Sequence, residues 1–126
     1  MSVPPPDAGP ATDLARPMPR PTAQVEPFVA VLGAKLAVQF LLQFGGAELY
    51  LAKNPKGRSA VAELVGVDMA RALAESDGVA AQRRIPLAKR WLAAMLSWQG
   101  HSTAQIARTL RVTDTSARKW LKEAGR

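Results

Sequence analysis

Cysteine is absent from this chain of 126 residues, and histidine occurs once, at position 101. Without cysteine no disulfide and no thiolate metal site can form, and a single histidine cannot build a histidine cluster around a metal. His101 stands beside a predicted helix end, and no pair of carboxylates occupies a plausible acid–base site. We therefore expect the chain not to be an enzyme and to need no cofactor and no metal.

Long hydrophobic runs are also missing. The most apolar stretch, Val29 to Leu42, has 14 residues and contains Lys35, whereas a helix needs about 20 apolar residues to cross a bilayer. Residues 1–27 contain no apolar core segment of the kind that a secretory signal needs. We expect a soluble, cytoplasmic protein without a membrane partner.

The net charge of +7 is unevenly distributed. Residues 83–126 contain ten Lys and Arg against two acidic residues, a balance of +8, while residues 1–82 contain seven basic and eight acidic residues, a balance of −1. A localised basic region is the electrostatic footprint of nucleic-acid binding. A membrane surface is the other anionic partner to consider, but no broad apolar face lies opposite these basic residues. We favour nucleic acid.

The motif within this basic region is His101 to Lys122, HSTAQIARTLRVTDTSARKWLK, which has the pattern of a helix-turn-helix. Ser102 and Gln105 predict a capping box at the start of the first helix, and Thr113 predicts the cap of the second. The predicted inner faces, at apolar helical spacing, are Ile106, Ala107 and Leu110 in the first helix and Ala117, Trp120 and Leu121 in the second. The alternative is an ordinary helical hairpin with a solvated charged face.

One position departs from the pattern. The turn residue that is usually Gly, because it needs a positive φ, is Arg111 here. A non-Gly residue in this conformation costs about 1 kcal/mol, which leaves the motif intact.

The outer face of the second helix is predicted to read DNA, with its first turn in the major groove. The predicted base contacts are Thr113, Asp114, Thr115, Arg118 and Lys119. Arg118 can form a bidentate contact with guanine. For Asp114 the alternative is that its charge only stabilises the N-terminus of the helix, and for Lys119 the alternative is a phosphate contact. The predicted phosphate contacts are Arg108, Arg111 and Lys122, together with Lys53, Lys56 and Arg58 of a basic loop for which a solvated turn is the alternative.

Proline is concentrated at the N-terminus. Eight of the ten prolines fall within residues 1–27, where large apolar residues are scarce. Such a composition buries too little apolar surface to fold alone. We predict a disordered tail over residues 1–24, with a docking arm for a partner protein as the alternative.

A helical region with one short strand is predicted over residues 25–85. A helix from Val25 to Phe44, bent at Gly33, carries more apolar surface than one short helix needs, so a second subunit is the natural place to bury it. Gly45-Gly46 ends this helix. Residues 47–52 form a predicted strand, paired with another strand of this chain or of a symmetry-related copy.

A weak internal repeat with an offset of 33 residues links this helix to a second one over residues 60–76. Leu32-Gly33 aligns with Val65-Gly66, and Gly45 aligns with Gly78. Each copy is a helix, a glycine stop and a short extended segment, the second extended segment being residues 80–85. Two copies fall short of a solenoid.

A further helix is predicted from Leu87 to Gln99, with Pro86 in its first turn and Gly100 at its end. It packs behind the helix-turn-helix and completes a three-helix domain over residues 86–126. Its buried stripe is predicted to be Leu87, Trp91, Met95 and Trp98. We expect the tryptophans, including Trp120, to be core residues, with base stacking as the lesser alternative. The predicted fold class is mostly α.

The run from Leu32-Gly33 through Phe44-Gly45-Gly46 to Leu49-Tyr50-Leu51 resembles the helix, FGG and strand motif of the Mor family. Mor proteins are transcription activators of Mu-like phages and related prophages. The second glycine element at Val65-Gly66 and the C-terminal helix-turn-helix also fit, so the resemblance covers roughly residues 25–122. Two departures are Ala52, where a proline commonly follows the strand, and Gly78-Val79 in place of the second glycine pair.

The resemblance implies a dimerisation domain whose helices and strands intertwine between subunits, followed by one helix-turn-helix domain per protomer. It also implies a homodimer that binds promoter DNA and activates transcription by recruiting host RNA polymerase. The apolar stripe and the resemblance together predict a dimer interface of Leu32, Leu36, Phe40, Phe44, Gly45, Gly46, Leu49, Tyr50 and Leu51.

Two other functions stay open beside the activator. A DNA-packaging adaptor, such as a phage terminase small subunit, or a partition adaptor also joins such a DNA-binding unit to an oligomerisation region. The third possibility is a nucleotide-hydrolysing enzyme, because Gly45-Gly46 and Lys56-Gly57-Arg58-Ser59 suggest a phosphate cradle. Their spacing does not fit a P-loop, so we favour the activator.

Overall fold

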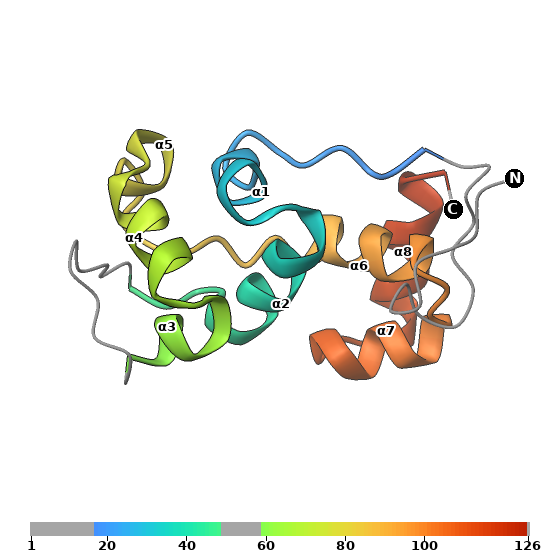
Figure 1. Cartoon of the computed structure of the whole chain (residues 1–126). Helices are drawn as coiled ribbons and strands as arrows, with labels where there is room; N and C mark the ends of the chain where they lie inside the picture. The colour runs from blue at the N-terminus through green and yellow to red at the C-terminus, as the bar shows by residue number, and fades with distance from the viewer. Residues whose placement is uncertain (1–16, 49–58, 126) are drawn as a thin grey trace, which may run out of the picture. The chain divides into compact units, whose positions relative to one another are not determined.

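The computed structural model describes residues 17–48 and 59–125, and within them the chain is mostly helical, as predicted (Figure 1). None of the helices in these two ranges is long and apolar enough to span a membrane. In chain order the helices are α1 (Glu26–Leu32), α2 (Ala34–Phe44), α3 (Ala60–Val65), α4 (Val67–Glu75), α5 (Asp77–Ala80), α6 (Lys89–Trp98), α7 (Thr103–Leu110) and α8 (Asp114–Glu123).

The chain divides into two compact units. Residues 21–48 and 59–88 form the first, which we call the helical unit, and residues 17–20 and 89–125 form the second, the helix-turn-helix unit. The predicted boundary after Ile85 lies three residues earlier than the observed one after Ala88. The difference arises because Pro86 and Leu87 continue the extended segment of the helical unit instead of starting α6.

Gly33 breaks the single helix predicted over residues 25–44 into α1 and α2. Its backbone angles are φ 81° and ψ 159°, a region that is essentially closed to residues with a Cβ atom. Nothing lies within 4 Å of the position that a Cβ would occupy there. The glycine is therefore required by the backbone conformation and not by close packing.

Gly66 makes the same break between α3 and α4, with φ 89° and ψ 157°. A Cβ at this position would again meet nothing within 4 Å. The two glycines lie 33 residues apart, which is the offset of the internal repeat. Each copy of the repeat is thus two helices joined by one glycine, and the helix predicted without a break over residues 60–76 is corrected accordingly.

The core of the helical unit forms because α1 folds back on α2 and also contacts α4 and α5, while α2 contacts α3. The ring of Phe40 lies 5.6 Å from that of Phe28 and 5.1 Å from that of Phe44, measured between centroids. The buried side chains of this unit are Val25, Phe28, Ala37, Val38, Phe40, Leu41, Ala62, Val65, Ala70, Leu73, Val79 and Ile85.

This packing changes the interpretation of the predicted dimer interface. Phe40 is 0% exposed within its own chain, so its side chain cannot lie on a surface that a second copy would contact. Leu32, Leu36 and Phe44 are half-buried. The break at Gly33 is the physical reason, because it returns α1 onto the stripe that a continuous helix would leave open. Leu49, Tyr50 and Leu51 lie outside the described residues.

Of the strand predicted over residues 47–52, only Ala47 and Glu48 lie within the described residues, and no strand is seen there. Glu48 instead forms an isolated antiparallel bridge with Arg84. The Ile85 N–H donates to the Ala47 carbonyl at 2.9 Å, and the Gly46 N–H donates to the Ile85 carbonyl at 2.7 Å. The partner of this segment is therefore the second extended segment of the same chain, which begins after α5 and continues beyond the predicted end at Ile85.

Candidate nucleic-acid interface

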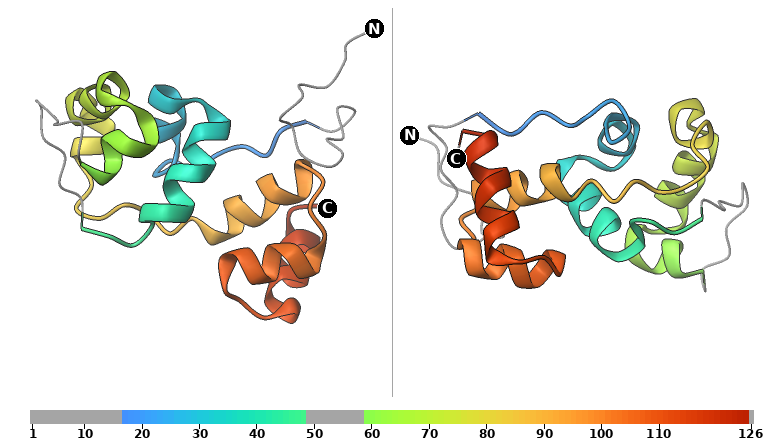
Figure 2. Two further views of the ribbon diagram at one scale, coloured as in Figure 1. Left: turned by 60° about the horizontal axis from the view of Figure 1, so that its bottom comes forward. Right: turned by 180° about the vertical axis from the view of Figure 1, so that it is seen from behind.

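Helices α6, α7 and α8 contact one another pairwise and form the helix-turn-helix unit (Figure 2, orange to red). Helix α6 supplies a continuous buried run from Trp91 to Leu96. Trp91 and Met95 are 4% and 1% exposed, as the predicted stripe requires. Leu87 is not part of that stripe, because it precedes α6 and is 55% exposed.

Helix α7 begins with the predicted capping box. The Ser102 hydroxyl accepts a hydrogen bond from the Gln105 N–H at 3.2 Å, and the Gln105 side-chain oxygen accepts one from the Ser102 N–H at 2.8 Å. Both pairings satisfy N–H groups that have no partner inside the helix. Ile106, Ala107 and Leu110 face the core and are buried, which is the predicted inner face.

The turn after α7 is a Schellman motif. The Val112 N–H donates to the Ala107 carbonyl at 3.0 Å, and the Arg111 N–H donates to the Arg108 carbonyl at 3.3 Å. Arg111 has φ 56° and ψ 50°, in the left-handed region. The position usually taken by Gly thus has the expected backbone conformation with an arginine in it, and the hydrogen bonds of the turn are retained.

Helix α8 is fixed at its start by Thr113. The Thr113 hydroxyl accepts a hydrogen bond from the Ser116 N–H at 3.0 Å, and Asp114 lies in the first turn, where a negative charge favours the helix N-terminus. Ala117 and Leu121 are 0% and 7% exposed and hold α8 against the other two helices. The rotation of α8 about its own axis follows from these two buried residues.

The buried residues of α8 leave its opposite face in solvent. Thr115, Arg118, Lys119 and Lys122 follow one another at intervals of three, one and three residues, which places them on one side of a helix. All five predicted base contacts are exposed: Thr113, Asp114, Thr115, Arg118 and Lys119. Of the predicted phosphate contacts, Arg108, Arg111 and Lys122 are exposed in the same unit, while Lys53, Lys56 and Arg58 lie outside the described residues.

The basic side chains of this face are not engaged in ion pairs within the described residues. Within the described ranges, Arg118, Lys119 and Lys122 form no ion pair with an acidic side chain. Glu123, the acidic residue at the end of α8, is instead paired with Arg90 of α6, at 3.3 Å between Nη1 and Oε2. Both partners are well exposed, so the pair adds little stability. It does direct the Glu123 carboxylate toward α6.

The tryptophans belong to the interior more than to the surface. Trp91 is buried, and its indole N–H donates to the Pro19 carbonyl at 3.2 Å. Trp98 and Trp120 are half-buried. The contact with Pro19 is not foreseen from the sequence, because a proline-rich composition predicts only a disordered tail over residues 1–24. From residue 17 onward that tail is described, and residues 17–20 belong to this unit.

Comparison with known proteins supports the helix-turn-helix. Residues 85–125 match the family model of a homeodomain-like domain, which covers α6, α7 and α8 and 41 of the 126 residues. No curated protein and no solved structure matches the chain. The chain therefore contains a homeodomain-like helix-turn-helix domain, and its three basic side chains on α8 lie on the face that such domains turn toward DNA.

Proposed function

We propose that this protein is a sequence-specific DNA-binding transcription activator. It acts as a homodimer in the cytoplasm of the cell that carries the phage or prophage. The observation that carries the proposal is the exposed face of Thr115, Arg118, Lys119 and Lys122 on α8, whose basic side chains form no ion pair among the described residues. The residues of this face supply both a bidentate base contact, through arginine, and contacts to phosphate. It is a binding function, and we assign no catalysis to it.

The homodimer is supported by the surface of the helical unit. The large apolar side chains Leu42, Val67 and Met69 are 37%, 36% and 41% exposed on α2 and α4. Covering exposed apolar side chains of this size with a second copy is favourable, because it removes apolar surface from water. One helix-turn-helix also reads too few base pairs for useful specificity, and a dimer doubles the site.

Activation, recruitment of host RNA polymerase and an origin in a phage or prophage rest on the resemblance to the Mor family. Gly33 and Gly66 have nearly the same backbone angles, so the two copies of the repeat share the same break between helices. This is in keeping with the duplicated glycine element on which the resemblance partly rests.

Selection of bound DNA from a random pool tests the proposal. We expect enrichment of a two-fold symmetric motif, with half-sites separated by about one or two helical turns. Absence of any enriched sequence would overturn sequence-specific binding. Light scattering on the same preparation should give a dimer, and a ring-like assembly would instead favour the packaging adaptor.

Two variants separate base reading from phosphate binding. Arg118→Ala should cost about 1–3 kcal/mol of binding free energy and relax the preference at one position of each half-site. Lys122→Ala should weaken binding to all sequences. It should also reduce the slope of log affinity against log salt concentration by about one, the value of one phosphate contact. Arg71→Ala, an exposed arginine on α4 of the helical unit, is the matched control and should leave both quantities unchanged.

A further inference from the structure

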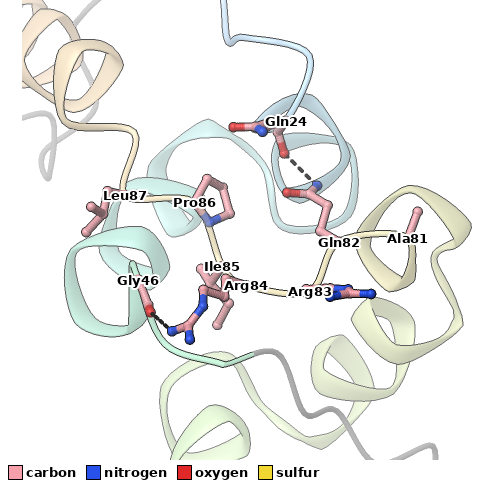
Figure 3. Close-up of a pocket in the computed structure, with 9 residues that line it drawn as sticks. All are labelled: Gln24, Gly46, Ala81, Gln82, Arg83, Arg84, Ile85, Pro86 and Leu87. Atoms are coloured by element: carbon pink, nitrogen blue, oxygen red, sulfur yellow. Dashed lines mark hydrogen bonds between the residues drawn. The ribbon is translucent and has the colours of Figure 1, made fainter.

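The extended segment from Gln82 to Leu87 lines a cavity of about 600 Å³ in the helical unit (Figure 3). Gln24, before α1, and Gly46, after α2, complete the opposite walls. The Gln82 side chain donates from Nε2 to the Gln24 carbonyl at 2.9 Å and to the Gly78 carbonyl at 3.2 Å. These two hydrogen bonds connect the extended segment to α5 and to the residues before α1 within one unit.

The backbone of this segment presents one open edge. Ile85 uses its N–H and its carbonyl in the two hydrogen bonds to Ala47 and Gly46. In extended backbone, adjacent residues direct these groups to opposite sides, so the N–H and the carbonyl of Arg84 point away from that pairing. Within the ranges 17–48 and 59–125 neither Arg84 group has a backbone partner. An open edge of this kind can accept another extended chain.

The side chains around the edge include two arginines and an exposed apolar side chain. Arg83 and Arg84 are exposed, and none of the described residues that line the cavity is an Asp or a Glu. The Arg84 guanidinium donates to the Gly46 carbonyl at 3.4 Å, which holds it at the rim. Arg83 forms no ion pair with an acidic side chain among the described residues. Beside them Leu87 is 55% exposed, more than any other large apolar side chain in these ranges.

We propose that this cavity binds an extended acidic peptide of a partner protein, which adds to the open edge at Arg84 and sets its carboxylates against Arg83 and Arg84. Carboxylates pair with guanidinium groups through charge-assisted hydrogen bonds, and Leu87 with Pro86 offers a contact for an apolar side chain of the peptide. A DNA backbone would use the two arginines but would leave this apolar part of the lining without a partner. The peptide therefore accounts for both the charged and the apolar part of the lining, whereas DNA accounts only for the charged part.

This site lies in the helical unit, outside the residues of α8 to which we assign DNA binding. It goes beyond the proposed function and does not depend on it. The two can be tested in the same preparation, because peptide binding and DNA binding are measured with different labelled probes.

Fluorescence anisotropy with the full chain tests the site. The probe is a short labelled peptide in which Glu and Val alternate, and the control probe carries Gln in place of Glu. We expect binding of the Glu peptide only, weakened by salt, and a loss of roughly tenfold or more in affinity for the double variant Arg83→Ala, Arg84→Ala. Leu87→Ser should weaken binding without changing its salt dependence, and Arg71→Ala should have no effect.

A charge-reversal variant distinguishes loss of the binding site from loss of folding. Arg83→Glu should bind the Glu peptide less tightly and gain affinity for a peptide in which Lys and Val alternate, which a misfolded protein would not do. Equal binding of the Glu and Gln peptides would overturn the proposal. It is also overturned if the double arginine variant loses affinity for a random-sequence DNA duplex while the Glu peptide never binds, since the arginines are then phosphate contacts.

Discussion

The indole N–H of Trp91 donates a hydrogen bond to the backbone carbonyl of Pro19, 72 residues earlier in the chain. Trp91 is 4% exposed, and its single polar group has to find a partner when the ring is buried. Pro19 lies in the proline-rich N-terminal stretch, yet it belongs to the helix-turn-helix unit. The unit is therefore assembled from two segments of the chain that the whole helical unit separates.

Replacing Trp91 with Phe should lower the free energy of unfolding of this unit by about 1–3 kcal/mol. The change removes the donor to Pro19 and leaves a small void in the core. Urea unfolding monitored by circular dichroism measures the loss, and Trp120→Phe, at a half-buried position, is the control with a smaller expected cost.

Deletion of residues 1–20 should remove much of the same stabilisation, so the two changes together should cost less than their sum. Full additivity would show that the contact with Pro19 adds nothing.

Replacing Gly33 or Gly66 with Ala should destabilise the helical unit by about 1–3 kcal/mol in each case. Neither position is crowded, since a Cβ would meet nothing within 4 Å, and so the whole cost is that of the backbone angles. Gly125→Ala is the control, because this residue also has a positive φ, 76°, but follows the last helix. Thermal unfolding compares the three. An unchanged melting temperature for Gly33→Ala would mean that α1 and α2 can merge into one straight helix.

Replacing Arg111 with Gly should stabilise the helix-turn-helix unit by about 1 kcal/mol, because Gly adopts the left-handed conformation without a steric cost. The same change removes a predicted phosphate contact, so the affinity for DNA and its salt dependence should both fall. Gly100 occupies the corresponding place after α6 with φ 102°, and Gly100→Ala should show the opposite effect on stability. A stabilised variant with unchanged salt dependence would remove Arg111 from the set of phosphate contacts.

Replacing Ser102 with Ala should cost about 1 kcal/mol of stability, since it removes the cap at the start of α7. Thr109→Ala, at an exposed position within the same helix, is the control and should change stability little. Equilibrium unfolding in urea measures both. If the two variants are equally stable, the capping box seen in the structure contributes nothing in solution.

The helix-turn-helix was largely predictable because its determinants are local. The capping box joins Ser102 to Gln105, the cap of α8 joins Thr113 to Ser116, and both span three residues. The apolar spacing likewise places Ile106, Ala107 and Ala117 inside without knowledge of the rest of the chain. Once those residues are buried, the helical period alone puts Arg118 on the outer face.

The helical unit was less predictable because its determinants lie far apart in the chain. A glycine at position 33 shows where a helix weakens, but its backbone angles decide that α1 turns back and buries Phe40. The partner of Glu48 is Arg84, 36 residues away in the chain. Leu87 has the spacing of a helical core residue, yet the extended segment before α6 leaves it in solvent.

The sequence by itself thus determined the DNA-binding motif, its caps, the concentration of positive charge beside it and the glycines that repeat at 33 residues. Each of these is a property of residue type and short spacing. Only the tertiary structure decided which apolar residues are core and which are open, that the stretch around Pro19 joins the helix-turn-helix unit, and that Arg83 and Arg84 border a cavity. Those outcomes depend on contacts between segments that are far apart in the chain, and the free energy of such contacts cannot be judged from a short stretch of sequence.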